Sequence, residues 1–315
     1  MNLNEIKTIG IAGAGVMGSS FAQIFAEYNY EIIMYDIAYE AFKKSQKLIE
    51  LNQRTLVEQG ALTQEQSYAI QKRIQFSCDM KTLADADFII EAIIEKMEIK
   101  HSFWGELSKL MRDDAIVTSN TSGLSLTEIA QAVKNPERFA GMHWVNPPHL
   151  IPLVEVICAN QTSANTAKVV YDLAAAIGQK PVMVKKDVPG FILNRIQFAV
   201  LREAMHIVDS GIANIEDVDN VFKYGLGIRY TAIGPLETAD LGGLDTFYDI
   251  SSYLLADLCD AKQPSTLLRD LVQHGNMGVK SGKGFYDYAD GKDKEAIRRR
   301  DMLIIKLAKC LWKQQ

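Results

Sequence analysis

The sequence of 315 residues lacks several features that would place it in a specialised class of protein. Its four cysteines, Cys78, Cys158, Cys259 and Cys310, are too few and too scattered for a disulfide framework or a metal site, which predicts reduced thiols, no metal and a cytoplasmic location. Positive charge is not in excess either. With 34 lysines and arginines against 39 acidic residues, a nucleic-acid partner is not expected.

Long apolar segments are also missing. No run approaches the length that crosses a bilayer, so no membrane association is expected. The first residues, MNLNEIKTIG, lack the basic start and apolar core of a signal peptide. The composition that remains is that of a globular protein, and its length allows about two domains.

The first part of the chain alternates short apolar runs with amphipathic helical patterns, which is typical of a mostly parallel sheet covered by helices. Strands are predicted within residues 7–13, 31–36, 87–93, 115–120, 138–144, 153–159 and 181–186. Beyond Pro189 and Gly190, the sequence reads as helix throughout. We therefore predict one α/β domain over residues 1–187 and one helical domain over residues 188–315.

The stretch GIAGAGVMG at residues 10–18 carries glycines at Gly13, Gly15 and Gly18 between a predicted strand and a predicted helix. In this context the first glycine permits a tight turn, the second lets a pyrophosphate approach the backbone, and the third lets helix and strand pack closely. The next strand ends in Asp36, whose carboxylate can accept hydrogen bonds from ribose hydroxyls and would repel a 2′-phosphate. The pattern predicts a Rossmann-type sheet that binds NAD rather than NADP.

A dinucleotide site needs a group that moves the substrate proton. His143 lies at the end of one predicted strand, and Glu155 lies within the next. An imidazole can take a hydroxyl proton while a carboxylate holds its other nitrogen, although a structural histidine beside a strand acid is an alternative interpretation. The polar run Ser-Asn-Thr-Ser at residues 119–122 ends another strand, at the sheet edge where ligands bind in open α/β folds.

Six motifs in order, GAGVMG, SNTSGLSLTEIA, GMHWVNPP, LVEVI, VPGFILNR and SGKGFYDY, resemble those of the 3-hydroxyacyl-CoA dehydrogenases. The resemblance covers residues 7 to about 288. It implies an NAD-binding domain followed by a helical domain that binds substrate and forms a homodimer. It also implies oxidation of a short-chain (3S)-3-hydroxyacyl-CoA to the 3-oxoacyl-CoA, as in fatty acid metabolism.

The same resemblance assigns roles to individual residues. It makes His143 the catalytic base and Glu155 its partner, and it places Ser122 and Asn194 at the substrate oxygen and reacting carbon. The residues that it assigns to the cofactor are Gly13, Gly15, Val16, Met17, Gly18, Asp36, Glu95, Lys100, Ser122, Asn146 and Lys280. Without the resemblance, Glu95 and Lys100 would read as solvated helix charges, Ser122 as a helix cap, and Asn194 as a capping or packing residue.

Two segments depart from the acyl-CoA enzymes: HWVNPPHLIPLVEV, and the long stretch YGLGIRYTAIGPLETADLGGLD. Both look like relatives that act on free hydroxy acids, namely L-gulonate 3-dehydrogenase (also lambda-crystallin) and, less closely, carnitine dehydrogenase. Arg229 in the second segment offers a planar fork for a substrate carboxylate, or else forms a surface ion pair. Asn52 and Gln59 stand near positions where the family has a CoA-contacting serine and lysine, and neither matches.

The expected function is therefore NAD-dependent dehydrogenation of a 3-hydroxyacyl-CoA. A dehydrogenase of a free 3-hydroxy acid is the alternative, and a non-catalytic NAD-binding or structural protein is the alternative of another class. The sequence after residue 291 predicts a basic amphipathic helix, either packed on its own domain or a partner subunit, or in contact with an anionic ligand or membrane.

Overall fold

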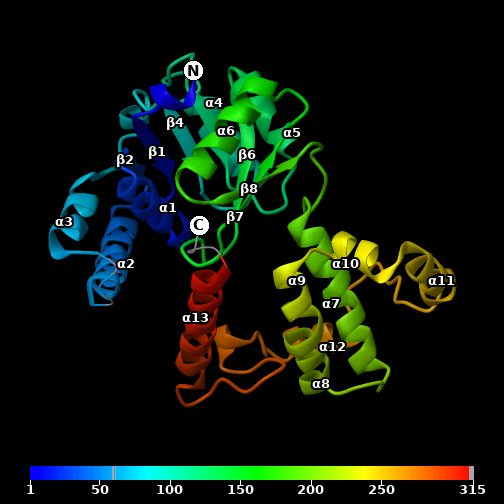
Figure 1. The fold of residues 1–315 in the computed structure, drawn as a ribbon. Helices are drawn as coiled ribbons and strands as arrows, with labels where there is room; N and C mark the ends of the chain where they lie inside the picture. The colour runs from blue at the N-terminus through cyan, green and yellow to red at the C-terminus, as the bar shows by residue number, and fades with distance from the viewer. Residues whose placement is uncertain (59, 61, 312–315) are drawn as a thin grey trace. The chain divides into compact units, whose positions relative to one another are not determined.

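The computed structural model describes residues 1–58, 60 and 62–311, and it divides into two compact units. Unit 1 contains Met1–Ile192, and unit 2 contains Leu193–Lys309. The two units are described separately below (Figure 1). In the part of the chain that the structure describes, no helix is long and apolar enough to cross a membrane, and no group of acidic, histidine or cysteine side chains could hold a metal ion. The four cysteines are free.

Unit 1 is built on one eight-stranded sheet in the order β3-β2-β1-β4-β5-β6-β7-β8. All neighbouring strands are parallel except β6 and β7, which are antiparallel. The strands are β1 (Thr8–Ala12), β2 (Glu31–Tyr35), β3 (Ile74–Ser77), β4 (Phe88–Glu91), β5 (Ile116–Ser119), β6 (Phe139–Trp144), β7 (Leu153–Ile157) and β8 (Lys180–Val184). The sequence predicted every strand except β3.

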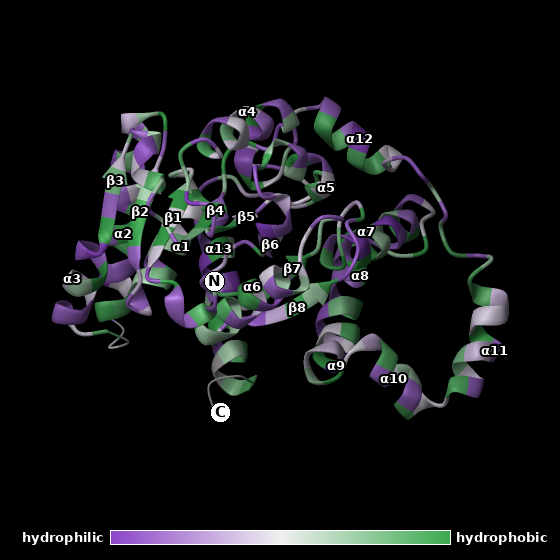
Figure 2. Cartoon of the chain, turned by 90° about the horizontal axis from the view of Figure 1, so that it is seen from above, coloured by the Kyte–Doolittle hydropathy of each residue, from purple (hydrophilic) through white to green (hydrophobic). Residues whose placement is uncertain are grey.

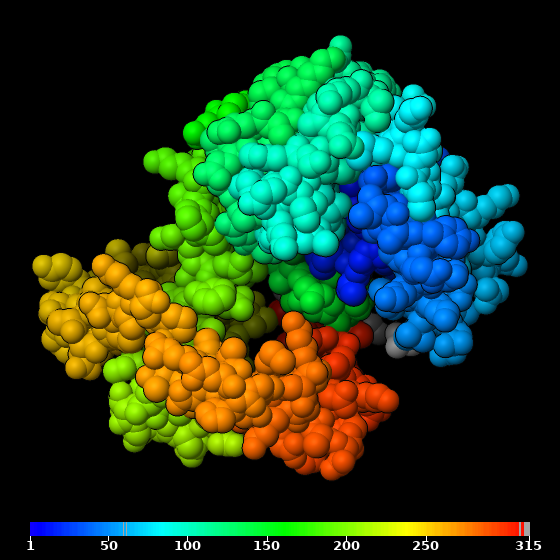
Figure 3. Space-filling model, turned by 180° about the vertical axis from the view of Figure 1, so that it is seen from behind, coloured from blue at the N-terminus to red at the C-terminus, as the bar shows by residue number. Residues whose placement is uncertain are grey.

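Helices cover both faces of this sheet. Phe21, Phe25 and Leu173, from α1 and α6, pack against one face, and Trp104 and Leu126, from α4 and α5, pack against the other. Figure 3, which views the molecule from behind, shows the teal atoms of the α4 region on the near face of unit 1. The helices of unit 1 are α1 (Val16–Glu27), α2 (Tyr39–Glu58), α3 (Gln64–Lys72), α4 (Met97–Leu107), α5 (Leu126–Ile129) and α6 (Ala164–Ala176). Burial on both faces explains why the central strands are almost wholly apolar.

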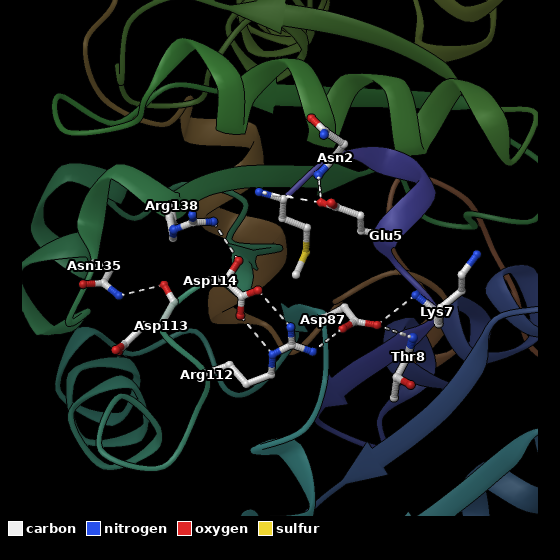
Figure 4. A network of polar contacts seen from close by, with 11 residues as sticks. Asn2, Glu5, Lys7, Thr8, Asp87, Arg112, Asp113, Asp114, Asn135 and Arg138 are labelled. Atoms are coloured by element: carbon white, nitrogen blue, oxygen red, sulfur yellow. Dashed lines mark hydrogen bonds and ion pairs between the residues drawn. The ribbon is translucent and has the colours of Figure 1, made fainter.

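A polar network ties the amino ends of the strands together (Figure 4). One oxygen of Asp87 accepts the backbone N–H groups of Lys7 and Thr8, at 2.8 and 2.9 Å. Its other oxygen accepts from Arg112, whose guanidinium also binds Asp114 at 2.8 and 2.9 Å. This network fixes the sheet at the edge opposite to the carboxyl ends of the parallel strands, so the carboxyl edge is left for ligands.

Unit 2 is mainly helical. Its helices are α7 (Leu193–Asp209), α8 (Ile215–Val221), α9 (Gly227–Ala232), α10 (Pro235–Gly242), α11 (Leu244–Leu254), α12 (Thr266–Gln273) and α13 (Lys292–Leu311). The last two residues of α13, 310–311, are assigned to unit 1. A π-helical turn covers Phe222–Leu226. The expectation of helix throughout this part was wrong for residues 255–265 and for the longer stretch 274–291. There, Gly278 and Lys283 form an isolated antiparallel bridge, and Gly282 at φ +79° ends a short 3-10 turn. The glycine-rich sequence favours such tight turns over helix.

Candidate active site

The glycine loop follows β1 and opens α1, and its three glycines meet different surroundings. Gly13 has φ +105°, and a Cβ there would lie 2.5 Å from the Ala92 carbonyl oxygen. A Cβ on Gly18 would lie 1.9 Å from the Gly13 oxygen, whereas a Cβ on Gly15 would meet nothing within 4 Å. Gly13 and Gly18 are thus needed by the fold itself. Gly15, the N-cap of α1, faces open space at the end of a helix whose first N–H groups have no intrahelical partners.

Asp36 follows β2 and turns toward this loop. Its Oδ2 accepts the Ala14 N–H at 2.8 Å, and its Oδ1 accepts the Ala38 N–H at 2.9 Å. A carboxylate offers about four acceptor positions, so each oxygen of Asp36 can still accept one ribose hydroxyl. Together, the open position at Gly15, the helix N-terminus and the oriented Asp36 fit the pyrophosphate and ribose of NAD. Val16 and Met17 are the first residues of α1.

His143 and Glu155 face each other directly across the antiparallel pair β6–β7. His143 Nδ1 lies 2.8 Å from Glu155 Oε2, and the two residues are 4% and 0% exposed. The second oxygen of Glu155, Oε1, accepts the Ile192 N–H at 2.9 Å. An ionised carboxylate only accepts hydrogen bonds, so with Glu155 ionised, Nδ1–H donates to it and Nε2 is the nitrogen with a free lone pair. This is the arrangement of a general base held by an acid.

A buried ion-pair network links the loops that follow β4 and β5. Lys100 is 1% exposed, and its ammonium bonds Glu91 at 2.5 Å and Glu95 at 3.2 Å. Glu91, fully buried, also accepts from Ser119 at 2.7 Å. Glu95 accepts the hydroxyl of Thr121 and, at 2.8 Å, the N–H of Ser122. The network therefore holds the loop that carries Ser122.

The environment of Glu95 controls its protonation. Burial acts to raise its pKa, but the Thr121 hydroxyl, the Lys100 ammonium and the Ser122 N–H outweigh this and lower the pKa from its ordinary value. Glu95 is consequently ionised at neutral pH and keeps its hold on the Ser122 loop. The interpretation of Lys100 as a solvated helix charge was wrong, because the residue is 1% exposed and its ammonium pairs with the carboxylates of Glu91 and Glu95.

The structure thus brings several predicted residues into contact: His143 with Glu155, Glu95 with Lys100 and Ser122, and Asp36 with the glycine loop. Asn146 is exposed in the turn after β6. Asn194, Arg229 and Lys280 belong to unit 2, on α7, on α9 and in a 3-10 turn at Val279–Ser281. Arg229 is exposed and forms no salt bridge with the residues described in its own unit. Gln59 lies outside the described residues, and Asn52 lies on α2.

Sequence reasoning missed Glu91 and Phe191, and it gave Asn120 no specific partner. Glu91 reads as one acid in an apolar strand, and only its contact with Lys100 reveals its role. Asn120 accepts the Trp144 N–H at 2.9 Å and so ties the Ser122 loop to the strand of His143. Asn120 belongs to the polar Ser-Asn-Thr-Ser run at residues 119–122, which the sequence already placed at this edge of the sheet. Phe191, in the VPGF motif, packs on His143 with ring centroids 5.5 Å apart.

Comparison with known proteins agrees with these features. The family model "3-hydroxyacyl-CoA dehydrogenase, NAD binding domain" matches residues 8–188, and the model "3-hydroxyacyl-CoA dehydrogenase, C-terminal domain" matches residues 190–288. A probable 3-hydroxybutyryl-CoA dehydrogenase of Deinococcus radiodurans is 39% identical over 280 residues, which are 89% of this chain and 99% of that protein.

A second relative is similar along more of the chain. The 5-formyl-3-hydroxy-2-methylpyridine 4-carboxylate 5-dehydrogenase of Mesorhizobium japonicum is 34% identical over 96% of this chain and 97% of its own length. A crystal structure of an enzyme with this activity, described as an NAD+-dependent dismutase, superposes with a TM-score of 0.90 at 33% identity and covers 97% of this chain and 98% of that one. The predicted Rossmann fold and NAD cofactor are confirmed, and the chain belongs to the 3-hydroxyacyl-CoA dehydrogenase family, whose members are NAD-dependent oxidoreductases acting on CH–OH groups.

Proposed function

We propose that this protein interconverts a substrate hydroxyl and carbonyl with His143 as the general base. The observation that carries the proposal is the buried His143–Glu155 pair at 2.8 Å on the sheet that also carries the NAD-binding loop. A histidine that served only to fill the core would not require a fully buried acid on one nitrogen while the other keeps its lone pair. The non-catalytic alternative offers no reason for this arrangement.

The chemistry follows from the protonation states. Bound NAD supplies the hydride acceptor. His143 Nε2 takes the proton from the substrate hydroxyl, and Glu155 stabilises the imidazolium that forms. In the reverse direction the same imidazolium returns the proton to the carbonyl oxygen. We propose, from the family motifs, that Ser122 and Asn194 contact the substrate oxygen.

The cofactor would be held by the amino end of α1 at Gly15, Val16 and Met17, and by Asp36 at its ribose. We propose that Glu95, Asn146 and Lys280 add further contacts. The enclosure of Lys100 by two carboxylates supports an indirect part for this residue, through the Glu95 that it orients.

As substrate we propose a short-chain (3S)-3-hydroxyacyl-CoA. The family models and the 39% identity to a probable 3-hydroxybutyryl-CoA dehydrogenase support this class. The homodimer that the sequence predicted is part of the same proposal, and the cytoplasmic location stays a prediction.

A free carboxylate substrate is the second candidate, and one observation favours it. The match to the pyridine-carboxylate enzyme covers 96% of this chain, whereas the match to the Deinococcus relative covers 89%. The name of that enzyme's substrate includes a carboxylate. On this hypothesis Arg229 would bind the acid group. The family's CoA-contacting serine, absent near Asn52, would not be needed, because a free acid carries no CoA.

The base is tested by His143→Gln, which keeps a hydrogen-bonding side chain but removes the basic nitrogen. We expect turnover to fall on the order of 10²-fold or more while NAD binding stays within twofold, because a positioned general base contributes about 10²–10⁴ in rate. Stopped-flow absorbance of NADH and calorimetry with NAD measure the two quantities. Wild-type turnover in the variant would refute the assignment of His143.

The substrate class is tested by Arg229→Met, assayed with 3-hydroxybutyryl-CoA, free 3-hydroxybutyrate, L-gulonate, carnitine and 5-formyl-3-hydroxy-2-methylpyridine 4-carboxylate. If the acid is bound by Arg229, truncation costs about 2–5 kcal/mol, which is roughly a 30-fold or greater loss in kcat/KM for the acid. The matched control is Arg269→Met, another exposed arginine of unit 2. Strong thioester turnover that ignores Arg229→Met, with no acid turnover in the wild type, would exclude the second candidate.

A further inference from the structure

A short segment between β8 and α7 contacts the proposed base and its acid. This segment, Asp187–Ile192, is called the clip here, and it is fixed at both ends within unit 1. At its start, one oxygen of Asp187 accepts the Ser125 hydroxyl and the Thr127 N–H, both at 2.8 Å. At its end, the Ile192 N–H donates to Glu155 Oε1 at 2.9 Å.

The backbone of the clip adopts an unfavourable conformation at Phe191. Gly190 has φ +76°, and Phe191 has φ +49°, in the left-handed region that large side chains rarely enter. Such a conformation costs free energy, and it persists only where the surroundings over-determine it. Phe191 is nevertheless 1% exposed, so its ring is held in a fixed position.

The side chain of Phe191, which lies in this strained turn, packs on the imidazole of His143. The two ring centroids are 5.5 Å apart, with an angle of 58° between the planes. Nδ1 of the same imidazole lies 2.8 Å from Glu155 Oε2, and the Ile192 N–H of the clip donates to the second oxygen of that carboxylate. One six-residue segment therefore constrains both members of the pair.

We propose that Phe191 and the N–H of Ile192 are positioning groups for the His143–Glu155 pair. Phe191 fixes the ring plane and keeps water from the Nδ1–H bond, and Ile192 fixes the rotation of the Glu155 carboxylate. The inference rests on the proposed function, because it takes His143 as the base. It adds that the orientation of Nε2 depends on a residue that takes no part in proton transfer.

The test compares two ways of removing the ring. Phe191→Leu removes the ring but leaves an apolar side chain. Phe191→Asn removes the ring and introduces a residue that tolerates the left-handed backbone conformation. Phe191→Tyr retains the ring as the conservative rescue. The matched control is Phe139→Leu, because Phe139 is equally buried on the same strand as His143 but packs on Trp104, with centroids 5.7 Å apart.

The first readout needs no substrate. In proton NMR of the ligand-free protein, the Nδ1–H proton of His143, assigned by its loss in His143→Gln, should exchange with water at least tenfold faster in Phe191→Leu and Phe191→Asn. The second readout uses 3-hydroxybutyryl-CoA and NAD, with which kcat should fall tenfold or more while KM stays within twofold. A misplaced catalytic group can cost this much. Phe191→Tyr and Phe139→Leu should keep both properties within threefold.

The outcomes separate the two proposals. If Phe191→Leu keeps the wild-type exchange rate and kcat, or loses no more than Phe139→Leu, Phe191 is only a core residue and the inference is overturned. If Phe191→Asn does not fold, Phe191→Leu alone decides. If instead His143→Gln retains turnover, the proposed base fails, and the NMR result still reports whether the clip orders the pair.

Discussion

The buried charges beside the glycine loop show why a single side chain can be essential without touching a ligand. Glu91 and Lys100 are 0% and 1% exposed, and removing such charges from water is costly unless each finds partners. Here Glu91 accepts from Ile93, Lys100 and Ser119, so the carboxylate is well satisfied. Removing either Glu91 or Lys100 would therefore leave the other as an unpaired buried charge, which would destabilise the fold around the site.

We expect Lys100→Met to destabilise the protein by about 3–5 kcal/mol, since it leaves the buried carboxylate of Glu91 without its cation. Urea unfolding of the NAD-free protein measures this. Lys168→Met is the control, because Lys168 is 72% exposed and forms a surface pair with Asp172, where a change within about 0.5 kcal/mol is expected. If Lys100→Met and Lys168→Met lowered the free energy of unfolding equally, the structural role of Lys100 would be contradicted.

Some residues of the site could be predicted from the sequence and others could not. Their places in or at the end of apolar strands made His143 and Glu155 candidates, and the family motifs then assigned them as base and partner. What the sequence does not show is the antiparallel register of β6 and β7, which puts the two directly opposite each other. Glu91 and Phe191 were missed because a lone acid or aromatic in an apolar run looks like packing until its partner is known.

Among the elements, the strands with apolar runs were predicted, including the edge strand β8, whose sequence Pro-Val-Met-Val is apolar, but the other edge strand, β3, was not. β4 is buried along its whole length, so its Phe-Ile-Ile sequence is unmistakable. β3, with the sequence Ile-Gln-Phe-Ser, buries only Ile74 fully and pairs on one side only, with β2. With polar Gln75 and Ser77 alternating with two apolar residues, β3 carries little of the hydrophobic run from which the other strands were predicted.

The junction of β1 and α1 allows a sharp separation of folding from binding. Gly18→Ala should strongly destabilise unit 1, because its Cβ would overlap the Gly13 carbonyl oxygen at 1.9 Å. Gly15→Ala should leave stability unchanged or slightly higher, since its φ of −74° suits alanine and its Cβ meets nothing within 4 Å. The same Cβ would stand where the pyrophosphate must approach, so NAD affinity should drop at least tenfold.

Thermal unfolding and NAD calorimetry on both variants test this contrast. Gly105→Ala on α4 is a suitable control, because its Cβ also meets nothing within 4 Å and it lies outside the glycine loop and the Ser122 loop. If Gly15→Ala bound NAD as tightly as the wild type, the pyrophosphate could not lie against this turn.

Taken by itself, unit 2 does not close a core. Among its described residues only Met205 and Thr238 are buried. Large apolar side chains such as Phe198, Leu236 and Tyr248 are 61%, 83% and 76% exposed. Figure 2 shows green hydrophobic stretches alternating with purple hydrophilic ones along α11. Monomeric proteins rarely leave this much apolar surface in water, so the surface favours association with another subunit.

A second copy of this chain is the partner that we expect, because most soluble oligomers are symmetric homo-oligomers and a two-fold dimer is the commonest form. Light scattering at micromolar concentration should give about twice the 35.1 kDa of one chain. Tyr248→Glu on α11 would bury a charge in the interface and should raise the dissociation constant at least 100-fold. Tyr68→Glu, a substitution at a tyrosine of unit 1 that is 68% exposed, should leave the dimer intact. A wild-type protein that stays monomeric, or a Tyr68→Glu variant that dissociates as readily as Tyr248→Glu, would show that unit 2 is not the dimer interface.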